Sequence, residues 1–326
     1  MQTPRRVRDL GVTVGTLPPG PLNAITDVPG VRVGQTTISS GDLQTGVTAI
    51  VPDGYADGLP AAVAVGNGYG KLVGSTQVNE LGVIETPILL TGTLSVFRVA
   101  DALLTWLLDR DPQATSLNPI VGETNDGYLS DIRRRPITPE HVHAALDSAS
   151  PTLPTEGSVG AGTGTTALGY KAGIGTSSRT LDSGSIGALV QANFSGTLTV
   201  LGTPIPAEPL DADGNSCMIV IATDLPLDAR QLGRLARRAI FAMARVGSDY
   251  APGSGDYAIA FTTNREPAFP DRQLRAPFQA VTESVEEALL NSLTTATPTT
   301  GHHGHTAQAL SHDLVVTRLT SGGLLA

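Results

Sequence analysis

Short apolar runs alternate with turn-forming stretches along most of the chain. The clearest runs cover residues 47–51, 61–65, 185–194 and 257–261. They are rich in valine, isoleucine and alanine, and glycine, proline, asparagine or aspartate lies beside them, as is usual at turns. These runs therefore predict buried strands with tight connections between them.

Elsewhere the apolar residues recur at helical spacing. The predicted helices cover residues 95–109, a segment starting at Thr138, a segment between Asp224 and Gly247, and residues 283–293. The third is the longest of these, with Asp224 as its N-cap and Pro226 in its first turn. The last apolar run, residues 314–319, predicts a final strand. Both halves of the chain show the same mixture of predicted strands and helices, and neither an internal repeat nor a linker separates them. We therefore expect a single domain that comprises residues 1–326.

Composition narrows the class of protein. Hydrophobic residues make up 40% and charged residues 16% of the 326 positions, which suits a globular protein with a sizeable core. A net charge of −9 argues against nucleic acid or an anionic membrane as a partner. The single cysteine, Cys217, excludes an internal disulfide framework and a cysteine-based zinc site. Residues 1–8 are basic, but no apolar signal segment or membrane-spanning run follows, so we expect a cytoplasmic protein.

The boundary between a polar and an apolar run at Ser216 is the most informative feature of the sequence. Residues 211–215 are polar and turn-forming and residues 217–222 are apolar, so Ser216 stands at the start of a predicted buried strand. One interpretation is a hairpin turn leading into a core strand. The other is a self-cleaving peptide bond, in which the Ser216 hydroxyl attacks the Asn215 carbonyl. Ser216 would then be a new N-terminus, with its hydroxyl as nucleophile and its own α-amine as base.

Two loops offer polar groups or close backbone approach beside predicted strands. The glycine-rich loop 66–71 is either a turn or a place where the backbone approaches a substrate. Local sequence favours a solvated loop for residues 122–131, because Asn-Asp-Gly is ordinary turn chemistry. Alternatively, its Glu123 carboxylate holds a substrate ammonium, and its Tyr128 hydroxyl donates to a developing oxyanion.

Polar residues at the ends of two predicted strands are further candidates for catalytic roles. Asn193 ends a predicted strand and either caps a turn or offers its amide to an oxyanion. Ser254 and Asp256 open another predicted strand. Because residues two apart in a strand share a face, both side chains would point toward one site.

The glycine-rich stretch 157–179 is not a nucleotide site. No strand precedes its glycines, as the dinucleotide fingerprint requires, and Tyr170 interrupts the Gly-Lys pair of a phosphate loop. We expect its glycines to let the backbone reach a reacting centre, with Lys171 as a charged group nearby. The three histidines of segment 301–305 have no accompanying carboxylate or cysteine, so we expect a mobile surface loop and no metal site.

Taken together, these stretches resemble the DmpA-type aminopeptidases, the L-aminopeptidase/D-esterase and β-aminopeptidase family of self-processing serine hydrolases. The resemblance spans nearly the whole chain, and the shared order of its pieces makes it specific. The stretches that carry it are residues 17–34, 66–71, 123–128, 173–179, 215–216 and 253–256. The resemblance favours self-cleavage of the Asn215–Ser216 bond over a simple turn.

The resemblance implies roles for the candidate residues. Ser216 matches the nucleophile, Asn193 the oxyanion-stabilising asparagine and Tyr128 the active-site tyrosine. Ser254 and Asp256 match the paired groups downstream of the nucleophile, although some members have glutamate where this chain has Asp256. The loop before Ser216 looks short for the family.

The resemblance extends to substrate binding, fold and assembly. Glu123 is similar to the acidic residue proposed to bind the substrate's amino group, and Lys171 to a lysine near the site of related nylon-oligomer hydrolases. The implied fold is α/β, a four-layer αββα sandwich of the DmpA and ornithine acetyltransferase type, similar to Ntn hydrolases but differently connected. Self-cleavage would give residues 1–215 and 216–326, which stay together in an oligomer, commonly a tetramer of αβ heterodimers.

The implied activity is hydrolysis of small peptides, amides or esters with a free amine, one N-terminal residue at a time, through an acyl-enzyme. This chemistry needs no metal or organic cofactor. Two alternatives stay open. An acyltransferase of the ornithine acetyltransferase type would use a threonine nucleophile, against which Ser216 argues. A non-catalytic binding protein would keep an unprocessed chain.

Overall fold

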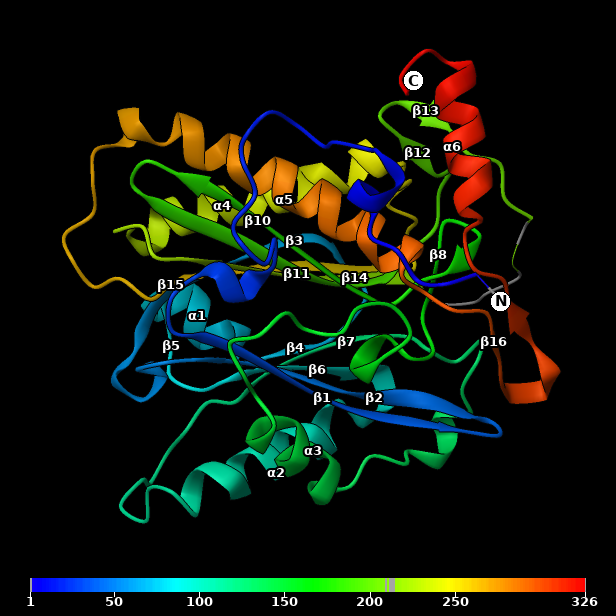
Figure 1. The fold of residues 1–326 in the computed structure, drawn as a ribbon. Helices are drawn as coiled ribbons and strands as arrows, with labels where there is room; N and C mark the ends of the chain where they lie inside the picture. The colour runs from blue at the N-terminus through cyan, green and yellow to red at the C-terminus, as the bar shows by residue number, and fades with distance from the viewer. Residues whose placement is uncertain (1, 209, 211–214, 326) are drawn as a thin grey trace.

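Two β-sheets lie face to face at the centre of the molecule, and helices cover the outer face of each sheet (Figure 1). The computed structural model describes residues 2–208, 210 and 215–325. This four-layer arrangement confirms the predicted αββα sandwich. The predicted turn at residues 211–214 lies outside the described residues.

The larger sheet contains the strand that begins at the Asn215–Ser216 junction. In spatial order its strands are β10 (Ile174–Leu181), β11 (Gly184–Asn193), β14 (Asn215–Thr223), β15 (Ser254–Thr262), β3 (Leu59–Gly68) and β5 (Val83–Ile84). β14 runs antiparallel to β11 and parallel to β15. The last residue of β11 therefore lies beside the first residues of β14 and β15, at one end of the sheet.

The smaller sheet faces the larger one across an apolar layer. Its strands, in spatial order, are β1 (Val31–Ser40), β2 (Leu43–Pro52), β6 (Ile88–Gly92), β7 (Ile120–Thr124) and β4 (Leu72–Val73). Gly122 of β7 packs against Met218 of β14, and a Cβ at Gly122 would lie only 2.4 Å from the Met218 Cε. The end of β7 thus comes close to the start of β14 from the facing sheet.

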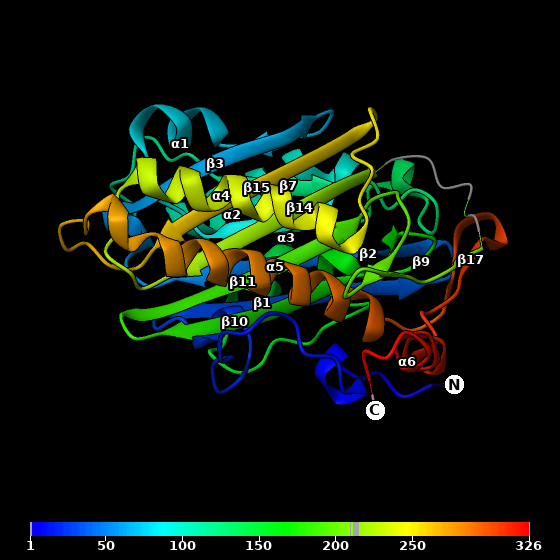
Figure 2. The same ribbon diagram turned by 90° about the horizontal axis from the view of Figure 1, so that it is seen from above.

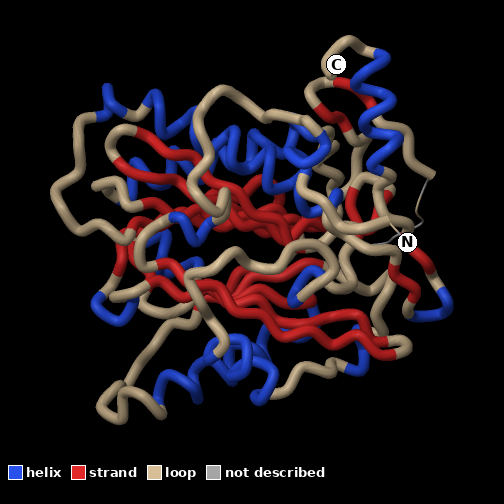
Figure 3. Tube along the Cα trace, viewed as in Figure 1, coloured by secondary structure: helices blue, strands red, loops and turns tan. Residues whose placement is uncertain are grey.

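Helices form the two outer layers. Helices α4 (Ala229–Met243) and α5 (Arg275–Thr294) cross the six-stranded sheet side by side (Figure 2). Helices α2 (Val96–Leu108) and α3 (Pro139–Asp147) cover the five-stranded sheet, and the four layers appear as successive bands of helix and strand in Figure 3. Besides short 3-10 helices, the other described elements are α1 (Ser75–Leu81), α6 (His312–Ser321) and the strand pairs β8 (Thr166–Ala167) with β9 (Tyr170–Lys171), β12 (Thr199–Val200) with β13 (Thr203–Pro204), and β16 (Thr299–Thr300) with β17 (Thr306–Ala307).

The layers explain why the run after Ser216 is continuously apolar. Ile219 points into the core under α4 and α5, whereas its neighbour Val220 points into the core between the two sheets. Successive strand residues face opposite sides, and here both sides are covered. Fully burying a valine or isoleucine side chain stabilises the fold by about 1.5–3 kcal/mol.

The helix after β14 begins later than predicted. Its N-cap is Asp228, whose carboxylate accepts a hydrogen bond from the Gln231 N–H at 2.7 Å. Asp224 instead accepts a hydrogen bond from the Ser185 N–H at 2.6 Å, so the prediction that it caps the helix is wrong. The prediction that this helix is the longest is also wrong, because α5 has 20 residues against 15 in α4.

The C-terminal apolar run is helical, so the predicted strand at 314–319 is wrong. Ser311 caps α6, and its side chain accepts a hydrogen bond from the Leu314 N–H at 3.2 Å. Val315 and Leu319 are buried and four residues apart, which places them on one face of a helix. The predicted helices at 95–109 and from Thr138 are confirmed as α2 and α3.

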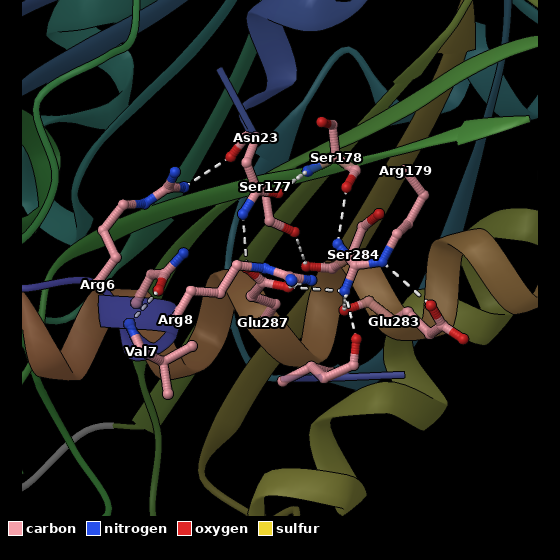
Figure 4. Close-up of polar contacts among 12 residues, drawn as sticks. Arg6, Val7, Arg8, Asn23, Ser177, Ser178, Arg179, Glu283, Ser284 and Glu287 are labelled. Carbon is pink, nitrogen blue, oxygen red and sulfur yellow. Dashed lines mark hydrogen bonds and ion pairs between the residues drawn. The ribbon is translucent and has the colours of Figure 1, made fainter. Parts of the chain in front are cut away.

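A buried ion network joins β10, α5 and the N-terminal segment (Figure 4). Arg179 of β10 has no exposed side-chain surface, and its guanidinium donates to Glu287 at 2.7 Å and to Glu283 at 3.1 Å. Arg8 donates to the other oxygen of Glu287 at 2.6 Å. Burial alone would raise the pKa of Glu287, but hydrogen bonding from Arg8 and the charge of Arg179 lower that pKa below its usual value. The network therefore holds ionised groups and depends on every partner being present.

We expect Arg179→Ala to lower the free energy of unfolding by about 3–5 kcal/mol, because it leaves buried carboxylates without their cation. Urea unfolding in a Ser216→Ala background, which removes the predicted self-cleavage, measures this. The control is Arg32→Ala, which removes an exposed ion pair with Asp53 and should cost less than about 1 kcal/mol. Equal effects of the two substitutions would contradict the assigned role of the network.

Candidate active site

Three strand ends bring the predicted polar residues together. Asn193 ends β11 and pairs with Ser216, the second residue of β14. On the other side of β14, Asn215 pairs with Ser254 and Ser216 with Gly255 of β15. The nucleophile candidate thus lies between the candidate oxyanion donor and the candidate paired groups.

The Ser216 hydroxyl lies beside the peptide bond that precedes it. It donates a hydrogen bond to the carbonyl oxygen of Asn215 and accepts one from the Gly255 N–H at 3.3 Å. The side chain is buried. This geometry keeps the Ser216 oxygen next to the carbonyl group that self-cleavage would attack.

The Asn193 side chain is held by its oxygen. Its Oδ1 accepts a hydrogen bond from the Thr166 N–H at 3.0 Å. Thr166 belongs to β8, which pairs with β9 through Thr166 and Lys171. Because the oxygen is bound to Thr166, the amide NH₂ is the end that can serve as a donor.

Ser254 and Asp256 share one side of β15, as their spacing predicted. The Ser254 hydroxyl donates to Asp256 Oδ1 at 2.7 Å, and Asn67 Nδ2 donates to Asp256 Oδ2 at 3.0 Å. Burial raises the pKa of Asp256 above its usual value, and these two hydrogen bonds limit the rise. The carboxylate is therefore fixed by a donor at each oxygen, close to the start of β14.

A cavity of about 480 Å³ opens beside Ser216. Its lining residues are Gly68, Tyr69, Gly70, Lys71, Thr93, Leu94, Glu123, Asn125, Ile132, Asn215, Ser216 and Gly253. Glycine is needed where the loop 68–71 meets β15, because a Cβ at Gly255 would lie 2.9 Å from the Gly70 Cα. This close backbone contact lets the loop form one wall of the cavity.

The structure places Glu123 in this cavity but already paired with a cation. Glu123 Oε1 accepts hydrogen bonds from the Lys71 N–H at 2.9 Å and the Lys71 ammonium at 3.4 Å. The same ammonium donates to the Thr93 hydroxyl at 2.8 Å. The predicted ammonium-binding carboxylate is thus part of an ion pair inside the protein.

Lys171 pairs with Thr166, whose N–H binds Asn193. The described lining of the cavity does not include Lys171. Its buried ammonium donates to the carbonyl oxygens of Gly162, at 3.1 Å, and Ala172. Burial lowers the pKa of Lys171 to about 7, against the effect of the Asp126 charge. Burial raises the pKa of Asp126 to about 7, and the Thr45 hydroxyl and the Lys171 charge oppose this rise. The two groups form a buried titratable pair.

This pair predicts a pH dependence of stability. The folded-state pKa of Asp126 lies above its unfolded value of about 3.9, so its contribution to the free energy of unfolding falls as pH rises from about 4 to about 7. Lys171 acts oppositely, and its contribution recovers as pH rises from about 7 toward about 10. The wild type should therefore lose stability between about pH 4 and about pH 7 relative to Asp126→Asn, which cannot titrate.

Urea unfolding across this pH range, again in the Ser216→Ala background, measures that difference. Asp182→Asn is the control, because Asp182 is exposed and its substitution should leave the pH profile parallel to that of the wild type. A parallel profile for Asp126→Asn as well would contradict the assignment.

Tyr128 packs against the histidine segment. Its ring stacks on His305 with centroids 4.6 Å apart, and its carbonyl oxygen lies 2.9 Å from His305 Nδ1. In this loop the described cavity lining includes Asn125 and does not include Tyr128. The expected oxyanion role of Tyr128 stays a prediction. Segment 301–305 lies at the surface and connects β16 to β17.

Sequence reasoning missed three residues at this end of the molecule. Asn67 belongs to the end of β3 (Leu59–Gly68), which extends into the predicted loop 66–71, and Lys71 lies just beyond this strand. From the sequence alone, only the backbone of this stretch is assigned a role, and Asp126 is explained by turn chemistry. A polar residue between glycines at a strand end is the signal that points to Asn67. Within the described ranges, no group of three or more His, Cys, Asp or Glu residues is placed to hold a metal ion. No helix there is long and apolar enough to cross a membrane.

Known proteins are similar to this chain over nearly its whole length. The β-peptidyl aminopeptidase BapA of Sphingosinicella xenopeptidilytica is 39% identical over 360 residues, which cover 94% of this chain and 89% of that protein. The solved structure of a Burkholderia sp. β-aminopeptidase is 36% identical with a TM-score of 0.92, and covers 98% of this chain and 99% of its own.

A second structure, the L-aminopeptidase D-Ala-esterase/amidase of Ochrobactrum anthropi, is 34% identical with a TM-score of 0.90 and the same coverage. It is described as a prototype for the serine aminopeptidases and a variant of the Ntn hydrolase fold. The model of peptidase family S58 matches residues 23–307. The chain therefore belongs to peptidase family S58.

Proposed function

We propose that the protein is a self-processing aminopeptidase with Ser216 as its N-terminal nucleophile. The observation that carries the proposal is the Ser216 hydroxyl, which lies against the Asn215 carbonyl at the wall of a cavity. Membership of a peptidase family supports peptides as substrates. The similarity to serine aminopeptidases of Ntn-like fold supports the N-terminal nucleophile.

Processing has two steps. The Ser216 oxygen attacks the Asn215 carbonyl carbon, the bond from that carbon to the Ser216 nitrogen breaks, and the proton of the hydroxyl passes to the leaving nitrogen. Water then hydrolyses the ester, giving residues 1–215 with a new carboxylate and residues 216–326 with a free α-amine. Both fragments stay in one folded domain, because β14 and β15 remain paired with β11 and β3.

The new α-amine supplies the base. A serine hydroxyl is a weak nucleophile and needs an adjacent base. The reference pKa of an α-amine, about 7.7–8.0, is close to the working pH. Ser254 and Asp256 lie beside the start of β14 and hydrogen-bond to each other. We assign them to orienting this amine and relaying its proton.

Substrate hydrolysis repeats the same chemistry. The Ser216 oxygen attacks the substrate carbonyl, and the Asn193 amide donates a hydrogen bond to the tetrahedral oxyanion. The amine product leaves with the proton, and water hydrolyses the acyl-enzyme. Glu123 accepts a hydrogen bond from the substrate's ammonium. The names of two relatives suggest β-amino acid residues as the released group.

Two further proposals concern the assembly, which the family resemblance implies, and the location, which is expected from the N-terminal sequence. We propose a tetramer of cleaved heterodimers in the cytoplasm. The test of processing is the intact mass and N-terminal sequence of the purified protein under denaturing conditions. Two fragments, the second beginning Ser216-Cys217-Met218-Ile219, are expected. A single uncleaved and inactive chain would overturn the proposed function.

A further inference from the structure

The cavity beside Ser216 contains one cation and one anion. Its only charged lining residues in the described chain are Lys71 and Glu123. They come from different parts of the fold, the loop after β3 and the end of β7, and meet at 3.4 Å. Before processing, the described side chains of the cavity wall therefore carry one charge of each sign.

Each member of the pair retains unused hydrogen-bonding capacity. The Lys71 ammonium has three N–H groups, of which two reach Thr93 and Glu123. The Lys71 side chain is 36% exposed, so its remaining donor can meet a ligand. Glu123 is only 2% exposed, and among the described residues its Oε2 has no hydrogen-bond partner. A buried carboxylate oxygen without a donor is costly and is usually satisfied by some partner.

An aminopeptidase substrate adds a positive charge to this site. Its ammonium is attracted by Glu123 but repelled by Lys71, which lies within a few ångströms of the same carboxylate. A substrate that also carries a carboxylate beside its ammonium avoids this conflict, because it adds one charge of each sign. The Thr93 contact holds Lys71 in the cavity to meet that carboxylate.

We propose that Lys71 makes the site selective for an N-terminal residue whose amine-bearing carbon also bears a carboxylate. Aspartate linked through its side-chain carboxyl has this structure. Its ammonium would bind Glu123, its free carboxylate would bind Lys71, and its side-chain carbonyl would be attacked by Ser216. This inference rests on the proposed aminopeptidase function and assigns the substrate class of the same site.

Two chromogenic amides that share one reacting skeleton test the proposal. β-Aspartyl p-nitroanilide differs from β-alanyl p-nitroanilide only by the carboxylate on the amine-bearing carbon. The wild type should hydrolyse the aspartyl compound with a kcat/KM at least about tenfold higher, the size expected of one charge-assisted hydrogen bond. Lys71→Met should abolish this preference, mainly by raising KM for the aspartyl compound.

Two further variants separate this role from a structural one. Lys71→Arg keeps the positive charge and should keep the preference, whereas a loss in both Met and Arg variants would indicate only packing and overturn the inference. Arg272→Met removes an exposed charge elsewhere and should leave the ratio of the two kcat/KM values unchanged.

The outcomes also separate this inference from the proposed function. If the wild type is processed and prefers the β-alanyl compound, the inference is wrong and the aminopeptidase assignment stands. If Lys71→Met changes both substrates equally, the inference is likewise wrong. An uncleaved chain that hydrolyses neither compound would refute the proposed function itself.

Discussion

Ser216→Ala should remain a single uncleaved polypeptide and should not hydrolyse amide substrates. The substitution removes the oxygen that attacks the Asn215 carbonyl, so no fragment beginning at residue 216 can form. It also removes the nucleophile for substrate, and loss of a serine nucleophile lowers turnover by on the order of 10⁶-fold. Intact mass under denaturing conditions and release of p-nitroaniline from β-alanyl p-nitroanilide measure the two effects.

Ser216→Thr is the matched variant, since it keeps a hydroxyl at the same position. It should still be cleaved, more slowly, because the added methyl group restricts the side chain in a buried strand. Appearance of the 216–326 fragment in Ser216→Ala would show that another group or a contaminating protease cleaves the chain.

Asn193→Ala should lower turnover of the processed enzyme by about 10²–10³-fold, the usual cost of removing one oxyanion donor. The same substitution should slow processing, because attack on the Asn215 carbonyl forms an oxyanion in the same place. Steady-state kinetics normalised to the concentration of cleaved enzyme measures the first effect. Turnover within about threefold of the wild type would contradict the oxyanion role.

Asn193→Asp distinguishes catalysis from stability. The side-chain oxygen of Asn193 accepts the Thr166 N–H, and Ala loses this acceptor, whereas Asp keeps it. Asp nevertheless lacks the NH₂ donor. Asn193→Asp should therefore lose turnover as severely as Asn193→Ala, although it keeps the acceptor for the Thr166 N–H. A loss of turnover confined to Asn193→Ala would indicate that the side chain acts only through its structural contact with Thr166.

The strands could be predicted because burial on both faces leaves a plain signature in the sequence. Residues 257–261 and 217–222 are apolar at every position, since both faces of β15 and β14 are covered. A continuous apolar run is also why the strand prediction for residues 314–319 is wrong. Leu314, Val315 and Val316 are equally apolar, but α6 buries Val315 fully and the other two only in part.

Site residues that lie at the ends of predicted strands could be identified from the sequence. Contacts between residues far apart in the sequence could not. Asn193, Ser216 and Ser254 each adjoin a recognisable strand, and strand pairing brings them together. The Lys71–Glu123 ion pair joins residues 52 positions apart, so local sequence contains no sign of it. The two-residue spacing of Ser254 and Asp256 showed that they share a face, but the Asn67 contact that completes their arrangement comes from a neighbouring strand.

The order of strands in the large sheet affects how the processed protein would resist unfolding by heat and denaturant. β14 and β15 lie between β11 and β3. The proposed processing would therefore leave two strands of one polypeptide in the middle of a sheet whose other strands belong to the second polypeptide. Once released, the 216–326 fragment would expose unpaired edges on both β14 and β15, a state prone to aggregation. Maturation would thus make unfolding irreversible, and the lifetime of the enzyme would be set by the rate at which the sheet first opens.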